Sequence, residues 1–263
     1  MAFPVAMNLD WEEMTTERST QKFPLGSVGR MIDGRAFRYA KNGGVALRAG
    51  SIVQGVAPQV WSAGGTSGPL ALENGTTQTS TWKTLQLETT FTTLDAKDYF
   101  KDGWLYVSST GHVATVGYSL QIKSSKAHTA SSTLLELTLM DGQHLLATLN
   151  TSDNSFGIMR NPYEAVIVVA QGAAPTAIVL GVPPMAITAS YYFWLQTWGL
   201  APVEAGSALA APGSGAVYST DVANTGLDDM YTSTGILGFG SIGHIITGSV
   251  AGAYVMVDLK LNP

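Results

Sequence analysis

Two stretches of the sequence, Leu25–Val53 and Leu180–Leu209, follow the same order of features. Each begins with Leu-Gly, runs through a loop ending in Met and Ile into an aromatic strand, and closes after a glycine turn at an Ala-Gly-Ser corner. From the aromatic strand to the corner the separation stays at 156 residues, the distance from Arg38 to Trp194. Self-similarity of this kind predicts two copies of one β-module. Short strings such as Leu-Gly also recur in glycine-rich β proteins without any duplication.

The composition favours many short strands joined by turns. Charged residues make up only 13% of the chain, and it contains 29 glycines. Val and Thr favour strands, while glycine favours tight turns. A chain of 263 residues suits one large or two moderate domains. We predict an all-β protein with an extended N-terminal arm (residues 1–24) and two tandem-related β-sandwich or barrel-like modules (residues 25–142 and 143–263).

The distribution of charge limits the partners that are expected. Up to Met140 there are 12 Lys and Arg against 11 Asp and Glu, whereas after it only Arg160 and Lys260 stand against eight acids. A surface so poor in charge is typical of subunit interfaces, although a neutral, Ser/Thr-rich surface in solvent has the same composition. Basic residues are neither in excess nor clustered, so no nucleic-acid partner is expected.

No membrane partner is expected either. The first residues lack the basic start and the long apolar run of a secretion signal. Two apolar stretches, Ala165–Leu180 and Ile236–Val257, are interrupted by glycines and by polar residues or proline. Neither stretch therefore predicts a helix that spans a membrane.

Local patterns predict several elements. Asp10 is placed to cap a short helical turn in the arm, and the arm itself is expected to lie on a neighbouring subunit or to stay disordered. Asp33-Gly34 predicts a hairpin turn, and Asp95–Phe100 predicts a helical turn. The alternation in Tyr254–Leu261 predicts a strand. The strand at Tyr191–Trp198 is apolar on both faces, so another sheet or another subunit must cover it.

The sequence contains only incomplete motifs for catalysis and for cofactor binding. Gly238–Gly243 fits the dinucleotide pattern G-x-G-x-x-G and Asp258 follows at a suitable distance, but the residues after it are β-branched and do not predict the required helix. Ser241, His244 and Asp228 contain the residue types of a hydrolytic triad without a nucleophile elbow. Cysteine is absent, which excludes thiolate chemistry and cysteine–zinc sites. No catalytic residue, cofactor or metal site is predicted, and the chain is not expected to be an enzyme.

The tryptophans allow two interpretations. Aromatic side chains in strands most often lie in cores or interfaces. They also form stacking platforms for sugars, which would suit an adhesin. The tryptophans considered for such a platform are Trp61, Trp82, Trp104, Trp194 and Trp198.

A succession of segments resembles a family of tailed-phage structural proteins, the head decoration or cement proteins. The segments are QKFPLGS, DGRAFRYA, ALRAGSIV, DYFKDGWLYV, GYSLQIKS, NPYEAVIVV, GVPPMAI and YYFWLQTWG, and they span Gln21 to Gly199. The loop Ser108–Thr115 departs from the family pattern because it is longer and lacks charge. The resemblance implies a virion protein made in the host cytoplasm and bound to the major capsid protein on the outer capsid surface, often as a homotrimer.

The leading hypothesis is thus a non-enzymatic decoration subunit that stabilises the shell through broad apolar contacts. The alternative is a receptor- or glycan-binding module of a phage fibre or tail. The residues predicted to contact the capsid or another subunit are Trp11, Phe23, Leu25, Arg35, Arg38, Tyr192, Trp194 and Trp198.

Overall fold

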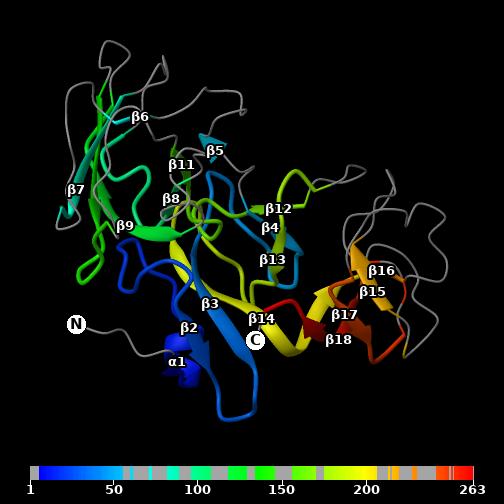
Figure 1. Ribbon diagram of the computed structural model, residues 1–263. Coiled ribbons are helices and arrows are strands. Elements are labelled where there is room, and N and C mark those ends of the chain that lie inside the picture. Colours follow the sequence, from blue (N-terminus) through cyan, green and yellow to red (C-terminus); the bar gives the residue numbers. More distant parts are fainter. Residues whose placement is uncertain are drawn as a thin grey trace. The chain divides into compact units, whose positions relative to one another are not determined.

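The computed structural model shows a chain built almost entirely of β-structure (Figure 1). It describes residues 6–55, 60–61, 71–72, 82–88, 96–107, 118–128, 134–145, 156–169, 175–205, 213, 215–218, 227–229, 241–248, 250 and 252–262. Within these residues the only helix is the single turn α1 (Trp11–Met14). The prediction of an all-β fold is confirmed. The loop Ser108–Thr115 lies outside the described residues.

The chain forms two compact units, and one is inserted into the other. Unit 1 comprises Pro58–Asn161, and unit 2 comprises Ala2–Ala57 together with Pro162–Pro263. The predicted boundary between residues 142 and 143 lies inside unit 1, since the strands on its two sides, β10 (Leu134–Leu139) and β11 (Phe156–Met159), belong to one sheet. Long-range strand pairing, which chain order does not reveal, causes this difference from the predicted tandem arrangement.

Unit 1 contains a seven-stranded sheet with the order β5-β11-β8-β9-β10-β7-β6. Alternate residues of its strands face one apolar core, which includes Leu105, Ile122, Leu137 and Phe156. Its strands are β5 (Val60–Trp61), β6 (Ala71–Leu72), β7 (Thr84–Glu88), β8 (Trp104–Val107), β9 (Ser119–Ser125), β10 (Leu134–Leu139) and β11 (Phe156–Met159).

Unit 2 contains an eight-stranded sheet, β1-β2-β3-β14-β18-β17-β15-β16, and a three-stranded sheet, β12-β4-β13. The first is formed by β1 (Met7–Asn8), β2 (Val28–Arg30), β3 (Ala36–Lys41), β14 (Tyr192–Glu204), β15 (Gly215–Tyr218), β16 (Leu227–Asp229), β17 (Gly243–Ile245) and β18 (Tyr254–Lys260). The second is formed by β4 (Val53–Gln54), β12 (Ile167–Val168) and β13 (Val179–Gly181).

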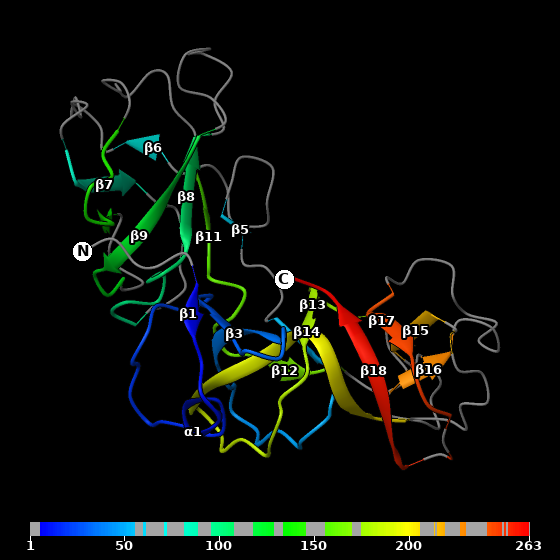
Figure 2. The same cartoon turned by 90° about the horizontal axis from the view of Figure 1, so that it is seen from below.

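The long strand β14 organises unit 2. Its first half pairs with β3 and its second half with β18, both antiparallel (Figure 2). The register with β3 shifts between Gln196 and Trp198, and the intervening Thr197 is fully buried. A bulge of this kind bends a strand and redirects its side chains. Two apolar clusters therefore pack along one strand, one around Phe193 and one around Val203.

The segments 41–50 and 181–190 pair with each other reciprocally in unit 2. Leu47 and Ile187 exchange both backbone hydrogen bonds, at 2.9 and 3.0 Å. The amide of Gly50 donates to Pro183 at 2.9 Å, and the amide of Ser190 donates to Gly43 at 2.8 Å. Leu47 and Ile187 are 140 positions apart, and so are the equivalent positions Gly43 with Pro183 and Gly50 with Ser190 in the two reciprocal bonds. They therefore use a register other than the separation of 156 found in the sequence, and duplication of a whole module stays a prediction.

The local predictions have mixed outcomes. The side chain of Asp10 caps α1 by accepting the Glu13 amide at 2.7 Å, and Gly34 takes the hairpin turn between β2 and β3 with φ +88°. Both predictions are confirmed, as is the strand β18. The helical turn predicted at Asp95–Phe100 is wrong. Asp98 adopts φ +64°, which a right-handed helix does not accommodate, so residues 97–102 form successive turns.

Candidate interaction surface

The N-terminal strap, residues 6–24, packs on unit 2 of its own chain. β1 pairs in parallel with β2, and Leu9 is buried against Gly29. Farther along, Arg18 and Tyr192 exchange backbone hydrogen bonds of 2.9 and 2.8 Å. The expected arm on a neighbouring subunit is thus an ordered strap on the chain that carries it. Apolar side chains facing inward at Leu9 and Met14 explain why this short segment is held.

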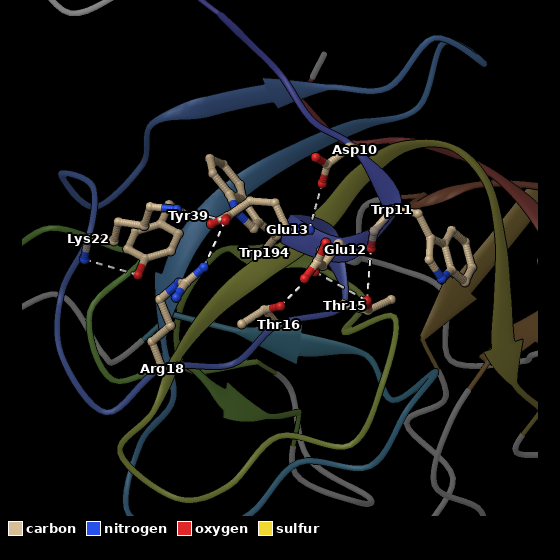
Figure 3. A network of polar contacts seen from close by, with 10 residues as sticks. All are labelled: Asp10, Trp11, Glu12, Glu13, Thr15, Thr16, Arg18, Lys22, Tyr39 and Trp194. Carbon is tan, nitrogen blue, oxygen red and sulfur yellow. Dashed lines mark hydrogen bonds and ion pairs between the residues drawn. The ribbon is translucent and has the colours of Figure 1, made fainter.

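Glu13 is the centre of the polar contacts under the strap (Figure 3). Its carboxylate accepts hydrogen bonds from Arg18 Nη2 and Lys22 Nζ, both at 2.8 Å, and from Trp194 Nε1 at 3.5 Å. Burial by itself would raise the pKa of this carboxyl. The hydrogen bonds and positive charges of Lys22 and Arg18 outweigh burial and hold the pKa of Glu13 below its ordinary value of 4.5.

An aromatic cluster lies beside this carboxylate. The Trp194 ring is 5.1 Å from Tyr39 and 5.4 Å from Phe23, and Tyr39 stacks with Tyr192 at 6.1 Å. The hydroxyl of Tyr39 accepts the Lys22 amide at 3.2 Å. Burial raises the pKa of Tyr39 above 10.0. The aromatic rings are therefore uncharged and shielded, and the Trp194 indole N–H donates to the Glu13 carboxylate.

The strand β14 is apolar on both faces, so each face must be covered. The strap covers one of them. Phe193 and Leu195 face the core of unit 2 on one side of β14, and Trp194 is fully buried on the other. The atoms that cover Trp194 come from Glu13, Phe23 and Tyr39. The sequence indicated that β14 must be covered twice, and the structure uses the chain's own N-terminal segment.

Beyond the bulge, β14 exposes Leu200 and Pro202, which are uncovered in the part of the chain that the structure describes. Pro202 pairs with Met256 of β18, and the Ile246 amide donates to the Met256 carbonyl at 2.8 Å, so an apolar row runs across β14 and β18 to the residue that follows β17. We define the β14–β18 face as Leu200, Pro202, Ile246, Tyr254 and Met256. Leu200 and Tyr254 are 52% and 55% exposed.

Charges at the two ends of the β14–β18 face are paired within the chain. At one end Lys260 lies 4.2 Å from the Trp198 ring and 2.9 Å from Asp258. At the other end Arg48 contacts Glu204 at 3.2 Å. The face is consequently apolar in the middle and close to neutral at its edges, which is the composition of an interface core.

The predicted contact residues have different environments. Trp11 is 64% exposed, whereas Leu25 and Trp194 are buried inside unit 2. Arg35 pairs with Asp33 at 2.8 Å, and Arg38 donates to Gly26 and Asn262 at 3.1 and 2.6 Å. Phe23, Tyr192 and Trp198 are half-buried. The structure gathers Phe23, Tyr192 and Trp194 around the strap and places Trp198 at the edge of the β14–β18 face.

Sequence reasoning missed the β14–β18 face. Alternation along β18 correctly predicted outward Met256 and inward Val255 and Val257. Pairing of Met256 with Pro202 depends on the bulge at Thr197, which no local signal marks. Leu200 also belongs to this face. Its exposure could have been predicted only if Gly199, which has φ +83°, had been taken as the point where the outward side of the strand changes.

Of the three residues with the types of a hydrolytic triad, the structure describes the side chains of Ser241 and His244. Ser241 Oγ lies 3.2 and 3.0 Å from the carbonyl oxygens of Ala216 and Gly243 and bonds to the backbone there. His244 is exposed on β17, and the Asp228 side chain lies outside the described part, as do Gly238–Gly240. Among described residues no cluster of three or more His, Asp or Glu side chains is arranged to hold a metal ion.

Comparisons with protein-family models, curated proteins and solved structures find no match for this chain. Among the residues described, no helix is long and apolar enough to cross a membrane. The class of protein that the observations define is therefore an all-β protein with an exposed apolar sheet face, and its function has to be argued from that face.

Proposed function

We propose that this chain is a non-enzymatic phage virion protein, a decoration or cement subunit that binds the major capsid protein on the outer surface of the head. The order of sequence segments from Gln21 to Gly199 suggests this class. The observation that carries the proposal is the β14–β18 face, an exposed and nearly neutral apolar surface on the eight-stranded sheet of unit 2. Adhesion requires such a surface and needs no reactive group.

The energetics fit repeated weak contacts. The exposed side chains of the face include Leu200, Ile246, Tyr254 and Met256. Burial of an apolar side chain stabilises by about 1.5–3 kcal/mol when it is complete. Because these side chains are already partly buried, the free energy gained when one copy binds is modest. The gains of many copies on one particle add up. One face alone is smaller than a standard stable interface, which favours binding as a homo-oligomer. The family resemblance implies that this oligomer is a trimer.

The test is occupancy on purified heads that lack the decoration protein. The double variant Leu200→Asp, Met256→Asp places two charges on the face without touching either core, and we expect at least a tenfold loss of bound copies, about 1.4 kcal/mol. Ile32→Asp, at a fully exposed position of the β2–β3 turn, is the matched control. Unchanged occupancy of the double variant would contradict the proposal. Circular dichroism checks that both variants are folded.

A further inference from the structure

The outer face of unit 1 carries two aromatic side chains on one strand. Trp104 and Tyr106 lie two residues apart on β8, between β11 and β9 (Figure 2). Leu105 between them is fully buried in the core, so both rings project from the opposite face. Two strand residues span about 6.8 Å, which places the rings side by side. Trp104 is 36% exposed and Tyr106 is half-buried.

The neighbouring strands β11 and β9 supply the residues beside these two rings. Met159 pairs with Trp104 and Gly157 pairs with Tyr106 on β11, while Gln121 and Ser119 take the corresponding positions on β9. A Cβ atom at Gly157 would lie 2.0 Å from Tyr106 Cζ, so the tyrosine ring occupies the space above the glycine. The β8 platform is defined as Trp104, Tyr106, Ser119, Gln121 and Met159.

Polar atoms at the platform are available to a ligand. Within the described ranges, the Trp104 indole N–H, the Tyr106 hydroxyl and the Gln121 side-chain amide have no hydrogen-bond partner. The backbone amide of Gln121 is held by Gln143 Oε1 at 2.6 Å, which fixes the start of this side chain. An aromatic surface bordered by amide and hydroxyl groups provides both stacking and hydrogen bonding.

The charge around the platform determines the class of ligand. Lys123, the next residue on the same face of β9, is neutralised by Asp141 at 2.9 Å. Recognition of a phosphate backbone depends on free Lys and Arg, and the platform itself contains none. Sugar rings present apolar C–H faces and neutral hydroxyls, which match the aromatic faces and the amide. We propose that the β8 platform binds a neutral glycan, with Trp104 and Tyr106 stacking on successive sugar rings.

The experiment titrates the full chain with cellohexaose, maltohexaose and chitohexaose, monitored by intrinsic fluorescence and by NMR. We expect saturable binding below about 10 mM for at least one of them. Trp104→Ala and Tyr106→Ala should each weaken binding at least about tenfold, while Trp104→Phe keeps a ring and recovers most of it. Trp11→Ala, which removes an exposed tryptophan from unit 2, should bind like the wild type.

Three outcomes would overturn the inference. They are no binding of any of these sugars at about 10 mM, equal binding by Trp104→Ala, and tighter binding of oligo-dT than of every neutral sugar. Thermal unfolding shows that each variant is folded, so a loss of binding is not a loss of structure. Occupancy on heads, which we assign to unit 2, should be unchanged in Trp104→Ala, and the two proposals can therefore fail separately.

Discussion

Two carboxylates of the strap bind the body of unit 2: Glu17 accepts hydrogen bonds from Thr188, and Glu13 lies in a charged network beside Trp194. The network is centred on Glu13. This residue joins two cations of the strap, Arg18 and Lys22, and also reaches the indole of the fully buried Trp194. Its side chain is only 18% exposed. Interactions at such a site are screened less than those of surface ion pairs. The ionisation of one residue therefore affects how firmly the strap covers β14.

Replacing Glu13 with Gln should destabilise the protein by about 1–2 kcal/mol at pH 7, because two charge-assisted hydrogen bonds become neutral ones. The folded pKa of Glu13 lies below 4.5. A lowered pKa adds stability that is fully present above the unfolded value and disappears as the pH falls through the folded value. Urea unfolding at pH 7 and near pH 3 should show the difference from wild type shrinking on acidification.

Glu12→Gln is the matched control, since Glu12 is exposed on the same helical turn and only its backbone carbonyl is engaged. It should behave like the wild type at both pH values. A difference between Glu13→Gln and wild type that stayed constant from pH 7 to the acidic measurement would show that the carboxylate charge does not stabilise the strap.

At the scale of elements, the reciprocal pairing of segments 41–50 and 181–190 explains where the backbone is strained. Gly50 and Ser190 occupy matched positions and both have left-handed backbone, with φ of +73° and +67°. Glycine adopts this conformation without a steric penalty, whereas serine does not. The pairing of Leu47 with Ile187 fixes the turn, so Ser190 is held in place by hydrogen bonds elsewhere in the pair.

Ser190→Gly should therefore stabilise the protein by about 0.5–1 kcal/mol, since the relief of left-handed strain exceeds the added entropy of the unfolded chain. Ser190→Ala keeps the Cβ atom and should give little change. Gly50→Ser should destabilise, because a Cβ there would lie 2.5 Å from the Tyr254 ring. Chemical denaturation of the three variants measures these effects. Equal stability of the glycine and alanine variants at position 190 would refute the strain argument.

The strap itself should depend on apolar packing as well as on Glu13. Met14 is 2% exposed and belongs to the cluster that contains Trp194. Met14→Ala should cost about 2–5 kcal/mol, the range for removal of a buried methionine side chain. Equilibrium unfolding monitored by circular dichroism is the measurement. A cost below about 0.5 kcal/mol, typical of surface positions, would mean that the strap does not pack as described.

The elements that sequence patterns predicted correctly are those determined by neighbouring residues. The Asp10 cap, the turn at Gly34 and the strand β18 all follow from chemistry within a few positions. Pairing of β4 with β12 and β13 joins residues more than a hundred positions apart, and no local pattern specifies it. The β14–β18 face was missed for the same reason, because Pro202 meets Met256 only after long-range pairing.

At the scale of the whole molecule, the insertion of unit 1 separates two cores. The apolar cluster of unit 1 contains residues between Leu85 and Ile158 only, and both clusters of unit 2 lie outside that range. The two sheets of unit 2 likewise share no strand with unit 1. Each unit thus has its own core and its own hydrogen-bonded sheet, which are the requirements for independent folding.

The points where the chain leaves and re-enters unit 2 are close together. A Cβ atom at Gly55 would lie 2.8 Å from the Pro162 carbonyl oxygen. Replacing residues 58–161 by a short Gly-Ser linker should therefore leave unit 2 folded, because the loop to be closed is short. Residues 58–161 expressed alone should also fold, with Asn161 still donating to the Asp102 carbonyl as it does here at 2.8 Å.

Cooperative unfolding of both fragments, followed by circular dichroism, is the expected result. The fragments also separate the two binding proposals, since the shortened chain should bind heads and the excised unit should bind sugars. Failure of the shortened chain to unfold cooperatively would show that unit 2 needs unit 1, even though the cores share no residue. If the shortened chain folds but does not bind heads, the β14–β18 face is not sufficient for attachment, and the contact has to include unit 1.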